Sequence, residues 1–520
     1  MGGQQCGRAL SVALIGLQGT VVEVETDIGS QLPGFSVLGL PDLSVRESKD
    51  RVRSAARNSG VPLSPRQITV NLTPATLPKR GSHFDLAIAA SVLQAQGVML
   101  GSPDTVYLAE LALDGALRPV RGVLPAVLAA VNSGYPNVVV AQANAAEAAL
   151  VPGAMVQGFE CLADVAETAG ADPQGLIRPT KRSTHTTARD GDDTSVSGDA
   201  ADFVDLADVA GQYDGRAAVE LAAAGGHHLL MCGPPGAGKT LLAERLPGLL
   251  PELDDAAATE VTAVHSLETR VSHRAELIRR PPFESPHHSA SATALLGGGS
   301  GIPRPGAVSR AHHGVLFLDE APEFDRGVLD ALRQPLETGS VRIDRAAASA
   351  RYPARFQLVM AANPCPCGRA SGKGQQCRCT PRERRSYFGK LSGPLLDRVD
   401  VRINVAPMSY AELMSVPGGE STATVAARVA HARELQRERL KPFGLRCNAE
   451  IGASVLMGEL KQPPRVTAAL EREMERGVLT ARGMHRVLRV AWTVADLDGR
   501  SVPTAEDVDT ALYFRARELA

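Results

Sequence analysis

The segment HHLLMCGPPGAGKTLLAERLPGLL, residues 227–250, decides the fold of the chain. It places a short apolar run, a glycine-rich turn and a helical run in that order, and residues 233–240 fit the pattern G-x-x-x-x-G-K-[ST]. In such a turn the backbone N–H groups point inward around a phosphate group. We therefore expect a bound nucleotide, contacted by Gly233, Pro234, Pro235, Gly236, Ala237, Gly238, Lys239, Thr240 and Leu241.

Side chains that suit ATP and Mg2+ occur in this turn and at the end of a second apolar run, GVLFLDE at residues 314–320. Lys239 can reach the β- and γ-phosphates, and the Thr240 hydroxyl can ligate Mg2+. Asp319 would hold the same Mg2+, and Glu320 would polarise the attacking water. The alternative is structural: a glycine-rich turn without a ligand, and a buried strand that happens to end in acids.

A third apolar run, FQLVMAANP at residues 356–364, ends in a polar side chain, Asn363. An amide beside the strand that carries Asp319 can contact the γ-phosphate or orient the attacking water. The alternative is an asparagine that caps a turn before Pro364.

Arg398 lies in a short polar stretch after an apolar pair, in SGPLLDRVD. At a subunit interface this cation could reach the γ-phosphate of a neighbouring copy and stabilise the charge of the transition state. The alternative is an ordinary ion pair with Asp397 or Asp400.

Apolar residues at helical spacing predict a helix over residues 481–497, and Thr504 with Asp507 predicts a capping box for the last helix. On the first of these helices Arg482, Arg486 and Arg489 share one face, which is usually a solvated face. In a lid over the nucleotide, one of these arginines would act as a second phosphate sensor.

The chain divides into four parts around these motifs. Apolar runs that alternate with helical runs after residue 201 indicate an α/β fold with a parallel sheet. Residues 173–200 are polar and cannot bury enough surface to become ordered, so we expect a flexible linker. The predicted parts are an N-terminal α/β domain at 1–172, this linker, a P-loop core at 201–405 and a helical lid at 406–520.

Composition excludes several classes of protein. Lys+Arg 55 against Asp+Glu 57 gives a net charge of -2, so any contact with nucleic acid needs a local basic patch. No apolar run has the length of a membrane span, and we identify no signal peptide. Eight cysteines in 520 residues do not form a disulfide scaffold. We expect a cytoplasmic protein with reduced thiols and no membrane partner.

Four cysteines fall within fifteen residues, with the spacing C-x-C-x9-C-x-C: Cys365, Cys367, Cys377 and Cys379. Four thiols at close spacing suit a tetrahedral Zn2+ ion. The alternatives are free thiols in a glycine-rich loop, or a redox pair.

Basic residues gather in the same segment and in a predicted hairpin. The segment from Arg369 to Lys390 carries seven basic residues, Lys373 among them, and one acidic residue, Glu383. Such a run of charge is usually solvated, and the alternative is contact with a phosphate backbone. SVRIDRAAASARYPARF predicts a hairpin with Arg345 and Arg351 beside its small-residue tip. GGGSG at 297–301 is a second loop that we expect to face the same partner.

Taken in order, these motifs resemble the ComM/YifB family of magnesium-chelatase-like AAA+ ATPases. The resemblance is carried by PFESPHHSASATALLGGG (282–299), RPGAVSRAHHGVLFLDEAPEF (304–324), QPLETGSVRIDRA (334–346), YPARFQLVMAANPCPCG (352–368) and SGPLLDRVD (392–400). It implies a hexameric ring ATPase that acts as a DNA helicase in branch migration, on single-stranded or branched DNA. It also implies Walker A, Walker B, sensor-1 and arginine-finger roles for Lys239 with Thr240, Asp319 with Glu320, Asn363, and Arg398. Arg482 becomes the candidate for sensor 2, with Arg486 as its competitor.

The N-terminal region resembles a Lon-protease-like domain, a fold whose nucleophile is a serine and whose base is a lysine. The serine position falls at Ser82 or His83, and the lysine position falls on Leu124, Pro125 and Ala126. A serine hydroxyl without an adjacent base is a poor nucleophile. We therefore predict that this domain has no peptidase activity.

Two other functions fit parts of the sequence. The motor subunit of a magnesium chelatase shares the P-loop core, but the extra N-terminal domain and the cysteine cluster are not expected of it. A protein remodeller shares the ring, but its pore usually carries an aromatic grip residue, whereas this hairpin offers small and basic residues.

Overall fold

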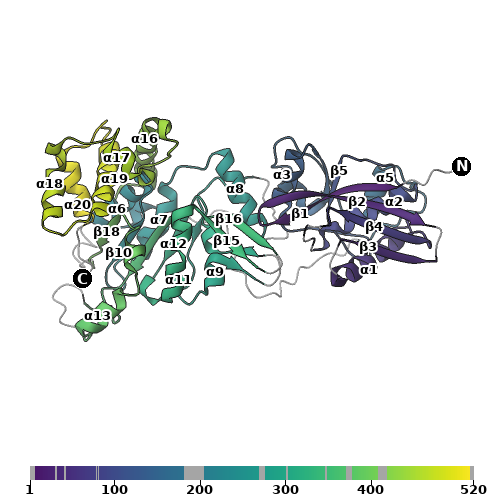
Figure 1. The fold of residues 1–520 in the computed structure, drawn as a ribbon, viewed down its shortest axis with the longest axis horizontal. Coiled ribbons are helices and arrows are strands. Elements are labelled where there is room, and N and C mark those ends of the chain that lie inside the picture. Colours follow the sequence, from purple (N-terminus) through teal and green to yellow (C-terminus); the bar gives the residue numbers. More distant parts are fainter. Residues whose placement is uncertain are drawn as a thin grey trace.

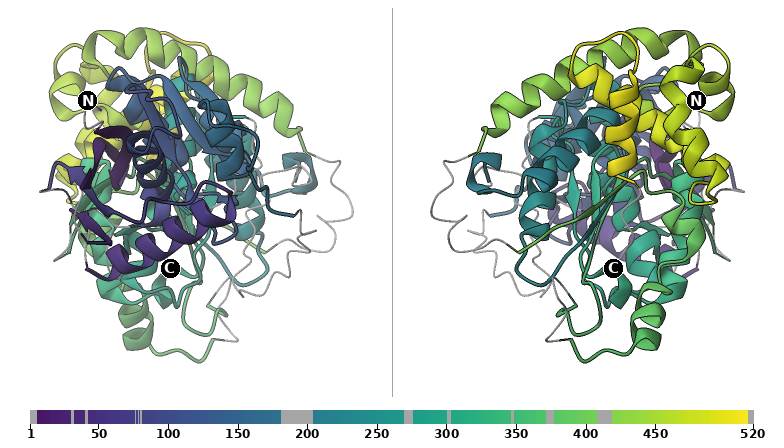
Figure 2. Two further views of the ribbon diagram at one scale, coloured as in Figure 1. Left: turned by 90° about the vertical axis from the view of Figure 1, so that its right-hand side faces the viewer. Right: turned by 90° about the vertical axis from the view of Figure 1, so that its left-hand side faces the viewer.

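The computed structural model describes residues 6–29, 32–39, 42–75, 77, 79, 81–180, 204–268, 276–299, 303–345, 348–370, 377–407 and 419–515. The fold is α/β, as predicted. Figure 1 shows the N-terminal domain at one end of the long axis, the core with the parallel sheet in the middle and the C-terminal helices at the other end. Figure 2 views the chain from these two ends. Among the described residues, no helix has both the length and the apolar character needed to cross a bilayer.

The N-terminal domain is a mixed seven-stranded sheet in the order β3-β4-β2-β1-β5-β8-β9. Its helix α2 is buried on all sides, which explains why its sequence is almost wholly apolar. The strands are β1 (Gly7–Ile15), β2 (Gln18–Gly29), β3 (Gly34–Leu38), β4 (Gln67–Thr73), β5 (Thr105–Leu108), β8 (Asn137–Ala141) and β9 (Met155–Phe159), with a small ribbon of β6 (Glu110–Leu111) and β7 (Leu117–Arg118). The helices are α1 (Asp42–Asn58), α2 (Asp85–Ala95), α3 (Val123–Asn132), α4 (Gln142–Ala148) and α5 (Leu162–Thr168).

The first part of the expected linker differs from the prediction. Residues 173–180 lie against the N-terminal domain, where the Ile177 N–H donates to the Ser59 carbonyl at 3.0 Å and Arg178 pairs with Asp164 at 2.7 Å. One backbone hydrogen bond and one ion pair thus hold a polar segment that composition alone describes as flexible. Residues 181–200 lie outside the described part of the chain.

The core is a five-stranded sheet in the order β11-β14-β17-β10-β18, and every neighbouring pair is parallel. The three strands expected from apolar runs are confirmed as β10 (Leu229–Cys232), β14 (Val315–Leu318) and β17 (Gln357–Ala362). The sequence interpretation missed β11 (Phe283–Glu284), which has only two residues, and β18 (Val401–Asn404), in which buried and half-buried residues alternate.

Helices surround this sheet, and the core also carries two short ribbons, of which β15–β16 lies on the side of the N-terminal domain (Figure 1). The helices are α6 (Tyr213–Gly225), α7 (Lys239–Leu249), α8 (Asp255–Ser266), α9 (Ala292–Leu296), α10 (Ala307–Arg310), α11 (Arg326–Ala331), α12 (Arg333–Thr338), α13 (Pro381–Phe388) and α14 (Gly393–Leu396). The ribbons pair β12 (Gly297–Gly298) with β13 (Arg304–Pro305), and β15 (Ser340–Asp344) with β16 (Ser349–Pro353). The predicted basic hairpin is therefore confirmed.

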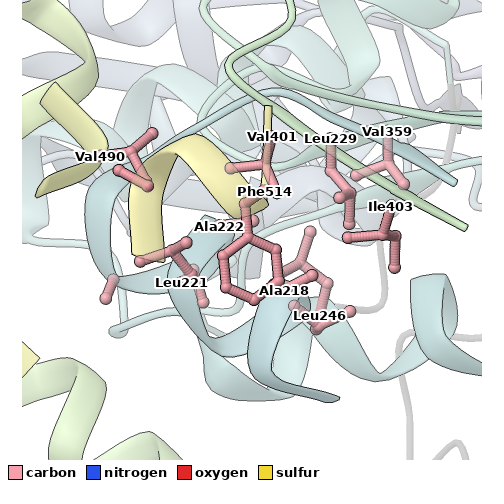
Figure 3. Packing of buried hydrophobic residues seen from close by; sticks show 14 of the residues in the cluster. Ala218, Leu221, Ala222, Leu229, Leu246, Val359, Val401, Ile403, Val490 and Phe514 are labelled. Atoms are coloured by element: carbon pink, nitrogen blue, oxygen red, sulfur yellow. The ribbon is translucent and has the colours of Figure 1, made fainter. Parts of the chain in front are cut away.

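The C-terminal region is helical, as predicted, and packs on one face of the sheet. Its helices are α16 (Thr422–Leu440), α17 (Ala453–Met457), α18 (Pro464–Glu475), α19 (Ala481–Leu497) and α20 (Ala505–Tyr513). Figure 3 shows Val490 and Phe514 of this region beside Leu221 of α6 and the sheet residues Val401 and Ile403, in one buried cluster. The predicted helix at 481–497 and the capping box of Thr504 and Asp507 are confirmed.

A buried carboxylate, Asp400, joins the core to helix α19. It accepts hydrogen bonds from His227 Nδ1 at 3.0 Å and from Arg486 at 2.8 Å, while His227 Nε2 lies 2.8 Å from the Thr493 hydroxyl. Burial alone would raise the pKa of Asp400, but the His227 hydrogen bond and the nearby Arg486 and Arg489 hold that pKa well below its usual value. The expectation of a solvated arginine face is therefore wrong for Arg486, whose side chain is 11% exposed.

Replacing Asp400 by asparagine is expected to lower the free energy of unfolding by about 3–5 kcal/mol, because Arg486 would remain buried without its anion. Urea denaturation followed by circular dichroism measures the change. The matched control is Asp397→Asn, because Asp397 is 44% exposed and lies 3.9 Å from Arg482, so that pair contributes about 0–1 kcal/mol. Equal losses in the two variants would contradict the assignment of Asp400 as the junction between the core and α19.

Candidate nucleotide site

The glycine-rich turn adopts the conformation that a phosphate loop needs. Gly236 has a φ of 77° and Gly238 a φ of 90°, which is the left-handed region that glycine adopts without strain, and α7 begins at Lys239. The Lys239 ammonium is buried between the carbonyls of Gly233, at 2.6 Å, and Pro234, at 2.9 Å. Burial lowers the pKa of Lys239.

Asn363 lies at the same edge of the sheet. Its Oδ1 accepts a hydrogen bond from Lys239 Nζ at 3.2 Å. The parallel pairing of β10 with β17, in which Cys232 lies opposite Ala362, brings the ends of the two strands together. The structure therefore places Asn363 beside the phosphate loop, where a sensor side chain would be.

The two side chains expected to ligate Mg2+ are in direct contact. The Thr240 hydroxyl donates to Asp319 Oδ2 at 2.9 Å, and Asp319 Oδ1 accepts from the Glu320 N–H at 2.9 Å. A hydroxyl and a carboxylate are the hard oxygen ligands that Mg2+ prefers, so this pair fits the ion.

Glu320 follows Asp319 with a φ of 49°, in the left-handed region that a residue with a side chain rarely adopts. Its carboxylate is about half exposed, and its Oε2 lies 3.6 Å from His288 Nδ1. The sequence interpretation quoted the segment that contains His288 without assigning the residue a role. The adjacent histidines at 287 and 288, directly after the edge strand β11, were the available signal.

Arg398 pairs with neither of the aspartates considered from the sequence. Its guanidinium bonds the carboxylate of Glu337 on α12, while the Asp400 carboxylate pairs with His227 and Arg486. Within the described part of the chain, no hydrogen bond or ion pair joins Arg398 to Lys239 or Asp319. The described ion pair of Arg398 is thus with Glu337 on α12 and not with a residue of the phosphate loop.

The two candidates for sensor 2 differ in their availability. Arg486 is committed to the buried pair with Asp400, whereas the Arg482 side chain is 78% exposed and has Asp397 at 3.9 Å as its nearest anion. The geometry therefore favours Arg482, which can move without breaking a buried contact.

The four cysteines come together beside the phosphate loop. Cys365 Sγ lies 3.3 Å from Cys367 Sγ and 3.6 Å from Cys377 Sγ, and all four sulfur atoms, including that of Cys379, fall within 4.8 Å of one another. Tetrahedral Zn–S bonds of about 2.3 Å would place the sulfurs at closely similar separations. The Arg369 N–H lowers the pKa of Cys367 to about 6, whereas burial and hydrogen bonds among the thiols raise the pKa of Cys365 and Cys379, so Cys367 is the thiol that most readily forms a thiolate. This cluster can hold a metal ion.

The cluster also touches the nucleotide site. The loop that carries it packs on the phosphate loop, because a Cβ atom on Gly368 would lie only 2.7 Å from the ring of Pro235. Of the basic residues predicted nearby, Arg382, Arg384 and Arg385 lie on α13, while Lys373 lies outside the described residues.

The basic hairpin carries exposed arginines on β15 and β16. Arg342 lies opposite Arg351 in the register, and the Arg345 N–H donates to the Ala348 carbonyl at 3.1 Å across the turn. Residues 346 and 347 at the tip, and 300–301 in the glycine-rich loop, lie outside the described part of the chain.

The Lon-like positions of the N-terminal domain do not form a catalytic pair. The Ser82 hydroxyl bonds the Glu110 carboxylate, and Leu124, Pro125 and Ala126 are buried apolar residues of α3. A cavity of about 370 Å³ lies here, between the N-terminal domain and the core, and is lined among others by His83, Ala126 and Tyr352 of the hairpin. The absence of peptidase activity stays a prediction.

The phosphate loop follows β10, Asn363 follows the neighbouring strand β17, and Asp319 follows β14, the next strand beyond β17. Together with the helical region against the sheet, these features define a P-loop ATPase of the AAA+ class. Family models agree with this class. The model described as "Magnesium chelatase, subunit ChlI" matches residues 205–413, "Subunit ChlI of Mg-chelatase" matches 24–144, and "Magnesium chelatase, subunit ChlI C-terminal" matches 419–515.

Relatives of similar length narrow the class to a family. An uncharacterized protein of Mycobacterium tuberculosis is 50% identical over 511 residues, 98% of each chain. The competence protein ComM of Haemophilus influenzae is 41% identical over 510 residues, 97% of this chain and 96% of ComM. The uncharacterized protein YifB of Escherichia coli is 41% identical over 509 residues, with the same coverage. The chain belongs to the ComM/YifB family of magnesium-chelatase-like AAA+ proteins, and this membership indicates an ATPase.

Similarity to Lon is partial. Lon protease 2 of Bacillus subtilis is 33% identical over 144 residues, which is 27% of this chain and 26% of that protease.

Changing Lys239 to alanine is expected to abolish ATP binding and hydrolysis, since the ammonium is the buried cation of the phosphate loop. Glu320→Gln is expected to keep ATP binding and to lower kcat by about 10²–10⁴-fold, as loss of a general base does. Fluorescent-nucleotide titration and phosphate release measure the two effects. Glu323→Gln, an exposed carboxylate three residues along, is the control and should leave kcat unchanged.

Proposed function

We propose that this protein is an ATP-driven motor that assembles as a ring, a hexamer by the family resemblance, and moves along single-stranded or branched DNA in the cytoplasm. The observation that carries the proposal is the pair of neighbouring ribbons, β12–β13 and β15–β16, that present arginines instead of apolar grip residues. Arg342, Arg345 and Arg351 all lie on the second ribbon or beside its turn. Such cations suit the phosphate backbone, whose contacts supply sequence-independent affinity.

The position of Arg398 supports assembly. An arginine that pairs with Glu337 and not with a residue of its own phosphate loop can serve the site of an adjacent copy, where it would stabilise the charge that develops on the γ-phosphate. Glu320 then activates the attacking water, and Lys239 and Asn363 hold the γ-phosphate. Thr240 and Asp319 would hold Mg2+, which would supply positive charge beside the phosphates.

Movement of the helical region follows from the same contacts. Arg482 lies at the exposed start of α19, so the loss of its contact with the γ-phosphate after hydrolysis would release this end of the helix, while Arg486 keeps α19 joined to the core through Asp400. The ribbons on the core would then move the DNA backbone that they contact.

The relationship to ComM supports DNA as the partner, because competence is the uptake of DNA by cells. The chelatase alternative is disfavoured by the cysteine cluster, which is not expected of that motor subunit. The N-terminal domain does not discriminate between the two functions, because residues 24–144 match the model described as "Subunit ChlI of Mg-chelatase". The remodeller alternative is disfavoured because the two aromatic residues of the hairpin sequence, Tyr352 and Phe356, are 1% and 9% exposed and cannot grip a polypeptide.

We also propose that the cysteine cluster binds a structural Zn2+ ion. Four sulfurs within 4.8 Å of one another, with no disulfide among the described cysteines, favour this ion over a redox pair. Its position against Pro235 and two residues after Asn363 would fix the shape of the nucleotide site.

Protein purified without chelator is expected to contain about one zinc ion per chain, since the four thiols form one tetrahedral site. Mass-spectrometric metal analysis measures the content, and Cys377→Ser should lower it strongly. Cys6→Ser, at an exposed cysteine far from the cluster in sequence, is the control. A zinc content near zero in the unmodified protein would contradict the proposal that the cysteine cluster binds zinc.

ATP turnover is expected to rise with single-stranded or branched DNA and to be indifferent to casein and porphyrin. Arg345→Ala should weaken DNA binding across sequences and lower the slope of log affinity against log salt by about 1, because one phosphate contact is lost. Branch migration of a synthetic Holliday junction, with Lys239→Ala as the inactive control, tests movement directly. A chain that stays monomeric with nucleotide and ignores polynucleotide would contradict the function.

A further inference from the structure

The cavity of about 370 Å³ between the N-terminal domain and the core is a second concave site of this chain. Figure 1 shows the junction, where β1 and α3 of the N-terminal domain face α8 and the hairpin β15–β16 of the core. None of the described residues that line this junction cavity belongs to the phosphate loop or to the strand ends around it. Its volume falls in the range of about 300–1,000 Å³ that is typical of small-molecule sites, which often lie between domains.

The most deeply buried side chains of the lining are apolar. Val12 of β1, Leu108 of β5 and Ala126 of α3 form the side of the N-terminal domain, and all three are buried. Tyr352 of β16 is buried on the side of the core, and its hydroxyl donates to the Pro303 carbonyl. An occupant of this part of the junction cavity therefore gains free energy from an apolar body.

The exposed side chains of the lining are cationic. Arg121 lies just before α3 and Arg304 lies on β13, and both are exposed. Within the described part of the chain, no ion pair involves Arg304. The order from buried to exposed thus places the apolar residues at the inner end of the junction cavity and the two guanidinium groups at its opening.

The described lining contains no aspartate or glutamate. Two carboxylates lie close to it along the chain, but Glu110 accepts a hydrogen bond from the Ser82 hydroxyl and Glu268 pairs with Arg310 at 3.1 Å. The imidazole of His83 adds no charge, because burial lowers its pKa to about 4. The charge that the lining offers to an occupant is therefore positive and comes from the arginines.

The lining suits an aliphatic molecule better than a peptide. Among its described residues there is no serine, threonine, asparagine or glutamine, and the Tyr352 hydroxyl is already engaged. A peptide would bring N–H and C=O groups to this wall and lose their hydrogen bonds to water, which costs free energy. An aliphatic chain has no such groups.

We propose that the junction cavity binds a small aliphatic carboxylic acid, with its chain against the buried apolar residues and its carboxylate at Arg121 and Arg304. A guanidinium group can hold a carboxylate by two parallel hydrogen bonds, so the arginines suit the acidic end. The bound acid would touch the N-terminal domain through Ala126 and the two ribbons through Tyr352 and Arg304, and would brace one against the other. This site is independent of the proposed motor function.

The test is isothermal titration calorimetry of the full chain with octanoate, 1-octanol and acetate. Octanoate has both the chain and the acid, whereas octanol has only the chain and acetate only the acid. Octanoate is expected to bind at one site per chain and about tenfold or more tighter than octanol, because octanol makes no charge-assisted hydrogen bond. Acetate should give no measurable binding.

Two variants change the two ends of the junction cavity separately. Ala126→Phe fills the apolar end and should abolish octanoate binding. Arg304→Ala, at an exposed position, should lower octanoate affinity about tenfold and leave octanol binding unchanged. Arg118→Ala, at an exposed arginine of β7 outside the lining, is the matched control and should bind octanoate as the unmodified protein does. Circular dichroism melting checks the fold of each variant, and the Arg304 variant carries the test if Ala126→Phe does not fold.

Absence of octanoate binding overturns the proposal, and so does equal octanoate affinity in Arg304→Ala and the unmodified protein. Octanol that binds as tightly as octanoate also overturns it, since the arginines would then have no part. N-acetyl-leucine tests the other source of a carboxylate on an apolar body, the end of a polypeptide chain. Tighter binding of N-acetyl-leucine than of octanoate would overturn the assignment to an aliphatic acid. A chain that fails as a motor on DNA leaves each of these outcomes unchanged.

Discussion

The parallel register of three short strands is the constraint on which the nucleotide site depends. Cys232 lies opposite Ala362 and Leu318 opposite Met360, so the residues that follow each strand emerge at one edge of the sheet. Lys239, at the start of the helix after the turn, reaches back to this edge and donates to Asn363. A slip of one residue in either pairing would turn every following side chain to the other face of the sheet and separate the cation from its partners.

Much of the core is predictable because its signals are local. Continuous apolar runs identify β10, β14 and β17, and a glycine-rich turn between a strand and a helix identifies the phosphate loop. The edge strand β11 is not predictable in the same way, since two residues carry no periodic pattern, and its extent is set by pairing with β14. The contact of Arg398 with Glu337 and the burial of Arg486 against Asp400 each join residues at least sixty positions apart, so only the folded chain reveals them.

The N-terminal domain is joined to the core by backbone and apolar contacts. The Gly122 N–H donates to the Ser266 carbonyl at 2.8 Å, and Ile15 and Leu17 pack against the cluster that underlies the arginine hairpin. The cavity at the Lon-like positions lies at this junction, and burial there lowers the pKa of His83 to about 4, which keeps its imidazole neutral. The region in which a Lon-like domain would hold its protease site therefore lies at the junction that also supports the two ribbons.

The packing of Gly368 on Pro235 limits how the loop after β17 can vary in length. Asn363 and Cys365 are separated by a single proline, and the peptide turns back onto the phosphate loop three residues after Cys365. An insertion between 363 and 368 would push the amide out of reach of Lys239 or lift the first two sulfurs from the other two. A change of length after residue 369 would leave this hexapeptide, and its contact with Pro235, unchanged.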